Sequence, residues 1–237
     1  MKRHQQKVPW GFVHVVLIVI LTVLCWSMVL FGLHTAGLLN APQDITRTTL
    51  LDTALLYLML YAIIVLVIGS AGGLPYLGYQ PFGRRGIITL ILAIPTWYVL
   101  LIVVGTVGAI LLNHGHALPS NVTTLFGKTS LNHLSATDVI LAFLVVSLIA
   151  PFVEETLFRG VLYQWLRGWI GGPLSVVLSA LIFGALHFTP LLLPVLFVMG
   201  CLLAIVFQIT KSLYVSMLLH SFNNTMTVLA LLLGFFH

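Results

Sequence analysis

The chain has 237 residues, of which 60% are hydrophobic and only 6% are charged, and its mean hydropathy is +1.14. A soluble globular domain carries about 25% charged residues, so the composition excludes that class. The formal net charge of +5 does not indicate a nucleic-acid partner, because the basic residues are scattered between apolar runs and form no basic tract. The composition predicts an all-α, polytopic membrane helix bundle.

A membrane-spanning helix needs about 20 predominantly apolar residues. On that rule the sequence predicts about seven transmembrane helices, at 11–33, 50–72, 87–112, 138–168, 174–189, 191–210 and 213–236. We divide the chain into an N-terminal part, residues 1–137, with three of these helices and their loops, and a four-helix core, residues 138–237. The core carries the polar residues that point to chemistry.

Basic residues orient the bundle, because cytoplasmic loops are enriched in lysine and arginine. If the N-terminus is cytoplasmic, that side carries Lys2, Arg3, Lys7, Arg84, Arg85, Arg167 and Lys211. The opposite side carries only Arg47 and Lys128. We therefore expect a multi-pass protein of the cell membrane with its N-terminus in the cytoplasm and its C-terminus outside.

The fourth predicted helix carries charges where apolar residues are expected. The chain has only five acidic residues and an ionisable group at membrane depth costs about 2.5 to 3.5 kcal/mol, yet Glu154, Glu155 and Arg159 lie in this helix. Its apolar run at 138–153 is too short to cross alone, so the helix must continue to the turn at 171–173. Glu155 and Arg159 have the spacing of an i, i+4 ion pair, which leaves Glu154 without a local partner. Burial would make that carboxylate a stronger base, so it is the candidate general base.

Polar residues on the fifth and seventh predicted helices lie at a matching depth. Counted from the turn between the fourth and fifth helices, Glu155 and His187 are each about 14 residues away, or roughly 20 Å at 1.5 Å per residue. His220 and Asn224 lie roughly 14 to 20 Å beyond Lys211 by the same count. We expect the three clusters to form one buried site. His220 and Asn224 would serve an oxyanion, or a metal and its surrounding partners.

The motifs Glu-Glu-x-x-x-Arg at 154–159, Phe-x-x-x-His at 183–187 and His-x-x-x-Asn at 220–224 resemble those of the CPBP intramembrane proteases, also called the Abi family. That family includes the type II CAAX prenyl endopeptidases and proteins linked to bacteriocin processing and self-immunity. The resemblance covers residues 138–230. It implies an intramembrane endopeptidase of a bacterial membrane that hydrolyses a membrane-associated peptide or protein.

The resemblance also implies a role for each matching residue. Glu154 and His187 would position and activate a water molecule, whereas His220 and Asn224 would stabilise the oxyanion. The supporting residues are Glu155, Arg159 and Phe183. If a zinc ion is bound, its ligands would be Glu154, His187 and His220. We favour the metal-free arrangement, because asparagine fits an oxyanion clamp better than a zinc site.

Two alternatives stay open at this point. A non-catalytic member would act as a membrane scaffold or immunity protein that binds a partner membrane protein. A transporter with a proton relay is a weaker alternative, since many transporters are built from repeats and no internal repeat is visible. The complete polar set favours the enzyme, because a scaffold would not need it. The sequence indicates neither the particular substrate nor an oligomeric state.

Overall fold

The computed structural model describes residues 7–35, 45–112 and 135–233, and within them the chain is helical with no strand. The N-terminal part contains α1 (Phe12–Thr35), α2 (Ile45–Ser70), a 3-10 turn (Leu74–Tyr76) and α3 (Arg84–Leu112). The core contains α5 (Ala136–Ala142), α6 (Ala150–Glu155), α7 (Gln164–Ile170), α8 (Gly172–Ala185), a 3-10 turn (Pro190–Leu192), α9 (Leu193–Thr210) and α10 (Leu213–Leu232).

Among the described residues, six helical stretches are long and apolar enough to cross a membrane, and α8 is a shorter apolar helix of 14 residues. The predicted all-α polytopic bundle is therefore confirmed. The prediction that the fifth helix extends to 189 is wrong, because α8 ends at Ala185 and His187 lies in the turn that follows. Phe188 has a φ of 52°, and Pro190 disfavours helical backbone in the residue before it. At 1.5 Å per residue α8 is about 21 Å long, shorter than a bilayer core of about 30 Å.

The fourth predicted helix is one continuous helical run, Ala136–Ile170. Within it α5, α6 and α7 are joined by π-helical turns at Phe143–Ile149 and Thr156–Tyr163. The run ends at Gly171, whose φ of 81° is readily adopted by glycine alone. The prediction that this helix continues through the charged residues to the glycine turn is confirmed. The two π-helical turns flank α6, which carries both glutamates, and such turns are frequent at functional sites.

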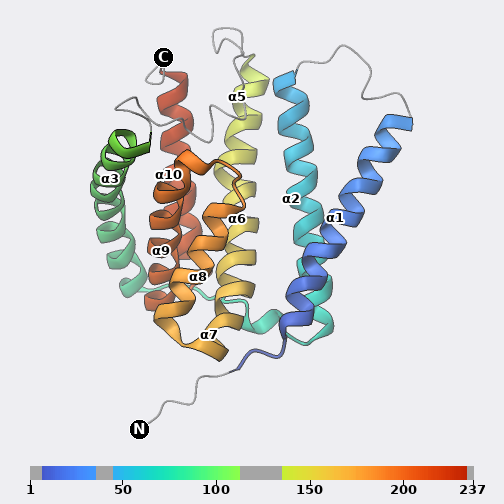
Figure 1. The fold of residues 1–237 in the computed structure, drawn as a ribbon, viewed down its shortest axis with the longest axis horizontal. Coiled ribbons are helices and arrows are strands. Elements are labelled where there is room, and N and C mark those ends of the chain that lie inside the picture. Colours follow the sequence, from blue (N-terminus) through green and yellow to red (C-terminus); the bar gives the residue numbers. More distant parts are fainter. Residues whose placement is uncertain (1–6, 36–44, 113–134, 234–237) are drawn as a thin grey trace.

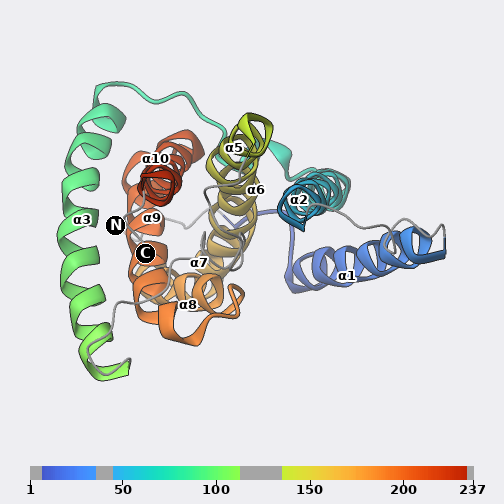
Figure 2. The same ribbon diagram turned by 90° about the horizontal axis from the view of Figure 1, so that it is seen from above.

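The N-terminal helices flank the core from opposite sides. Helix α2 packs against α5 and α6, whereas α3 packs against α9 and α10. Figure 2 shows this arrangement from above, with α3 and α2 on either side of the core helices. Helix α1 packs against α2 at the edge of the bundle (Figures 1 and 2).

Basic residues gather at one end of the bundle, which contains the start of α1, the loop before α3 and the turns before α8 and α10 (Figure 1). That end carries Lys7, Arg84, Arg85, Arg167 and Lys211. Burial, together with the positive charges of Arg167 and Arg85, lowers the pKa of Lys211. At the opposite end Arg47 Nε donates to Asp138 Oδ1 over 2.9 Å. Lys2, Arg3 and Lys128 lie outside the described residues.

Candidate active site

A buried ion pair lies at the centre of the site. Arg159 Nη1 donates to Glu155 Oε1 over 2.8 Å, and its Nη2 donates to the Gly200 carbonyl oxygen of α9 over 3.0 Å. Glu155 is 0% exposed and Arg159 is 1% exposed. The guanidinium carbon also lies 4.8 Å from the ring centroid of Phe183 on α8. The predicted pair is confirmed, and it connects the fourth helix to both α8 and α9.

His220 on α10 contacts both glutamates. Its Nδ1 lies 2.9 Å from Glu155 Oε1, and its Nε2 lies 3.8 Å from Glu154 Oε2. Because a carboxylate oxygen only accepts hydrogen bonds, Nδ1 donates to Glu155 and the ring is held with Nε2 towards Glu154. The sequence predicted only Arg159 as a partner of Glu155, so His220 is a second partner that the structure adds.

Glu154 has a partner on a helix outside the core. The hydroxyl of Tyr57 on α2 donates to Glu154 Oε1 in a short hydrogen bond. Glu154 was predicted to have no partner on its own helix, and Tyr57 was not predicted. A signal was present, because Tyr57 is about 13 residues, or roughly 20 Å, from the end of α2 at Ser70. That is the depth of the other polar clusters, whereas membrane tyrosines usually lie at the interface.

The Phe183 ring contacts both histidines. Its centroid lies 4.7 Å from the ring centroid of His187 and 5.8 Å from that of His220. The half-buried His187 places Nδ1 2.8 Å from the Phe183 carbonyl oxygen. Since a carbonyl only accepts, Nδ1 donates and Nε2 presents its lone pair. His187 and His220 therefore contact the same phenylalanine ring.

A chain of hydrogen bonds runs from Trp97 on α3 through Asn223 and Asn224 to the Val146 carbonyl. Trp97 Nε1 donates to Asn223 Oδ1 over 2.7 Å, and Asn223 Nδ2 donates to Asn224 Oδ1 over 3.1 Å. Asn224 Nδ2 in turn donates to the Val146 carbonyl oxygen over 2.9 Å. This chain fixes the orientation of the Asn224 amide. Neither Trp97 nor Asn223 was singled out from the sequence.

Pro151 explains why the Val146 carbonyl accepts a side chain. In this π-helical turn the backbone bonds join residues five apart, as from Ala150 N–H to the Val145 carbonyl. The next donor in that series would be residue 151, but proline has no N–H. The Val146 carbonyl therefore lacks its backbone donor, and the Asn224 amide supplies one.

Among the described residues, no group of three His, Cys, Asp or Glu side chains lies close enough to hold a metal ion. The zinc ligand set considered from the sequence, Glu154, His187 and His220, is therefore not assembled. Each histidine uses Nδ1 for a protein hydrogen bond, as metal-binding histidines also do, so the misfit lies in the spacing of the three side chains. These residues, as they are arranged, do not fit a zinc site.

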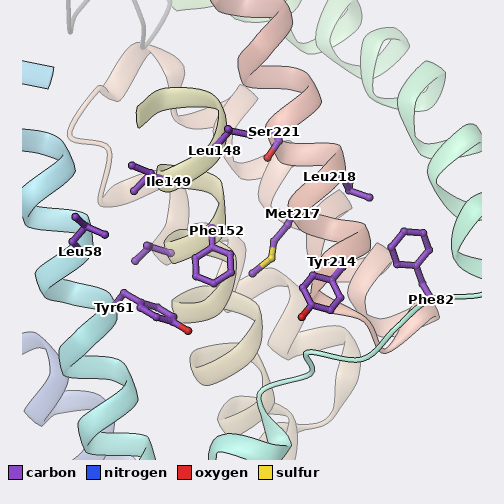
Figure 3. A pocket seen from close by; sticks show the side chains of 11 residues that line it. Leu58, Tyr61, Phe82, Leu148, Ile149, Phe152, Tyr214, Met217, Leu218 and Ser221 are labelled. Carbon is purple, nitrogen blue, oxygen red and sulfur yellow. The ribbon is translucent and has the colours of Figure 1, made fainter. Parts of the chain in front are cut away.

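An apolar cavity of about 690 Å³ lies beside the site. It is bounded by α2, the fourth helix, α10 and Phe82 from the connection before α3 (Figure 3). Val153 and Ser221, the sequence neighbours of Glu154 and His220, both line it. Glu154 and His220 themselves are not among the residues that line it.

Comparison with known proteins agrees with the motifs. Residues 136–226 match the model of a family described as Type II CAAX prenyl endopeptidase Rce1-like. This match confirms the resemblance stated from the three motifs, and it includes every candidate site residue predicted from the sequence. Tyr57 and Trp97 lie outside it.

A curated protein of Escherichia coli, described as an uncharacterized 24.3 kDa protein, is 33% identical to the chain over 144 residues. The aligned part covers 56% of this chain and 62% of that relative, so the chain spans less than two thirds of the relative's length. No solved structure matches the chain significantly.

Proposed function

We propose that this chain is an intramembrane endopeptidase that hydrolyses a peptide bond of a membrane-associated peptide or protein. The family match over residues 136–226 supports the reaction class. The observation that carries the proposal is that His220 hydrogen-bonds Glu155 and approaches Glu154 to 3.8 Å, deep in apolar helices. Ionisable groups at membrane depth are costly and mark functional sites.

The charges of the cluster suit His220 as an oxyanion donor. Two carboxylates and the Arg159 guanidinium sum to −1, and an imidazolium at His220 would bring the sum to zero. In that form Nδ1 donates to Glu155 while the Nε2 hydrogen is available for an oxyanion. Asn224, one turn further along α10, uses one amide hydrogen for Val146 and has a second for the same oxyanion.

In the proposed reaction Glu154 accepts a proton from a water molecule as the water oxygen attacks the carbonyl carbon of the peptide. His187 Nε2 accepts the other hydrogen of that water in a hydrogen bond. The negative charge that develops on the carbonyl oxygen is stabilised by His220 and Asn224. Glu154 then gives its proton to the amide nitrogen as the carbon–nitrogen bond breaks, which yields an acid and an amine.

Replacement of Glu154 by glutamine tests this proposal, because glutamine keeps the shape and removes the base. The purified variant, reconstituted in liposomes, would be assayed with fluorogenic peptides that include a farnesylated CAAX peptide and an unmodified transmembrane peptide. Asp52→Asn, on a half-buried acid of α2, is the matched control. We expect cleavage by the wild type and the control and none by Glu154→Gln. A Glu154→Gln variant with wild-type activity would refute the endopeptidase and favour a scaffold or immunity protein.

We also propose that the basic end of the bundle faces the cytoplasm of a bacterial cell membrane. The described residues place five basic side chains at that end and Arg47 at the other, as the positive-inside rule requires. The resemblance suggests bacteriocin processing or self-immunity as the biological role. Alkaline phosphatase fused to the C-terminus should be active outside the cytoplasm, and an inactive fusion would reverse the orientation.

A further inference from the structure

The N-terminal helices reach the candidate site at two separate places. Neither α2 nor α3 lies within the family match, which begins at residue 136. They pack on opposite sides of the core (Figure 2), and each contributes one hydrogen-bond donor. The Tyr57 hydroxyl of α2 donates to Glu154. The Trp97 indole of α3 donates to Asn223, which in turn donates to Asn224.

We propose that Tyr57 and Trp97 are positioning residues that orient Glu154 and Asn224 for the reaction. The proposal rests on the proposed function, because it assumes that both of those side chains act on the peptide. It gives the N-terminal helices a role in catalysis through the core residues they hold, and neither Tyr57 nor Trp97 needs to touch the substrate.

Tyr57 fixes the rotation of the Glu154 carboxylate. Its hydroxyl binds Oε1, so Oε2 is the oxygen that points to His220, at 3.8 Å from Nε2. Glu154 is only 9% exposed, and loss of the phenol would leave a buried oxygen without a partner. The carboxylate would then turn towards another donor, and the base would be displaced from the attacking water.

Trp97 fixes which way two amides point. An indole N–H is a donor only, so the Asn223 group that faces Trp97 must be its oxygen. The Asn223 nitrogen then faces the Asn224 oxygen, and the Asn224 nitrogen faces the Val146 carbonyl. Trp97 therefore acts together with the Val146 carbonyl, which accepts from the Asn224 nitrogen, to hold the Asn224 amide with its second N–H available as a donor.

Trp97 also packs in an apolar cluster that includes Leu203 and Leu219, so the test needs a control that keeps this packing. Trp97 is 3% exposed and lies about 13 residues, or roughly 20 Å, from the start of α3 at Arg84, the same depth as Tyr57. Its neighbour Tyr98 shows the contrast, because the Tyr98 hydroxyl is buried without a hydrogen-bond partner among the described residues. Loss of that hydroxyl removes an atom and no link to the site, which makes Tyr98→Phe the matched control.

The test compares Tyr57→Phe, Trp97→Phe and Tyr98→Phe with the wild type in liposomes, using the peptide that the wild type cleaves best. Removal of a hydrogen bond to a charged group should lower kcat about 10- to 100-fold in Tyr57→Phe. Removal of a neutral hydrogen bond should lower kcat about 3- to 10-fold in Trp97→Phe. KM should stay near the wild-type value in both, the melting temperature should fall modestly because a buried hydrogen bond is lost, and Tyr98→Phe should keep the wild-type kcat.

Wild-type kcat in Tyr57→Phe and Trp97→Phe would overturn the proposal, as would a change confined to KM. If Trp97→Phe accumulates poorly, Asn223→Ala decides, because it breaks the same chain without removing the indole and should lower kcat to a similar extent. Glu154→Gln in the same assay separates the two proposals. An active Glu154→Gln variant refutes the proposed function itself, whereas an inactive one beside a fully active Tyr57→Phe refutes only the positioning role.

Discussion

Replacing Arg159 by methionine should destabilise the protein by about 3 to 5 kcal/mol, the cost of breaking a buried ion pair by removing one partner. Methionine retains much of the length and the apolar contact with Phe183, so most of the effect should come from the lost charge. Glu155 is 0% exposed and would keep only the bond from His220. Because folded proteins are stable by about 5 to 15 kcal/mol in total, the loss should be visible in abundance.

The assay measures the amount of protein in the membrane and the melting temperature in detergent at one scan rate, because unfolding of such proteins is often irreversible. Arg85→Met, at an exposed position, controls for loss of a positive charge. A double variant with Glu155→Gln removes both charges and should recover much of the stability, since paired removal of a buried ion pair is often neutral. Wild-type abundance and melting in Arg159→Met would refute the role of the pair. A double variant no more stable than the single one would attribute the loss to packing.

Two further predictions concern helix packing and metal. Gly200→Ala should lower the melting temperature, because the added Cβ would lie 2.9 Å from Ala180 Cα. Gly105→Ala is the control: its added Cβ would meet nothing within 4 Å, so it should stabilise α3 by up to about 1 kcal/mol. Equal effects of the two substitutions on the melting temperature would contradict the close approach of α8 and α9. Chelators should leave peptide cleavage unchanged, because the described residues do not assemble the zinc ligand set, and stoichiometric zinc lost together with activity in His187→Ala would overturn this expectation.

Contacts within one helix were predictable from the sequence. The spacing of Glu155 and Arg159 fixes their distance once a helix forms, and the observed bond of 2.8 Å agrees. The apolar runs likewise predicted the helices of the described residues, of which six are long enough to cross a membrane and α8 is shorter, because hydropathy over about 20 residues determines what can cross a membrane. The end of α8 could not be found in this way, since hydropathy does not report the left-handed backbone of Phe188.

Contacts between helices were only partly predictable. The depth of a side chain in the membrane follows from counting residues along its helix, but the neighbouring helix that the side chain faces depends on packing. The same count of about 13 residues, or roughly 20 Å, that placed the polar motifs in one layer also places Tyr57 and Trp97 there. It does not indicate that Tyr57 faces α6, or that His220 Nδ1 meets Glu155. Those choices depend on the rotation of α2 and α10 about their axes, which interhelical packing determines.

The two adjacent glutamates have the same chemistry, and packing gives them different environments. Glu155 binds a guanidinium, with its full positive charge, and an imidazole. Glu154 binds the phenol of Tyr57, which orients the carboxylate without contributing a formal charge. A residue that must take a proton from water and return it to an amide nitrogen needs that second kind of partner. In the proposed mechanism the division of roles between the glutamates depends on α2, and Tyr57→Phe should impair Glu154 while leaving the ion pair of Glu155 intact.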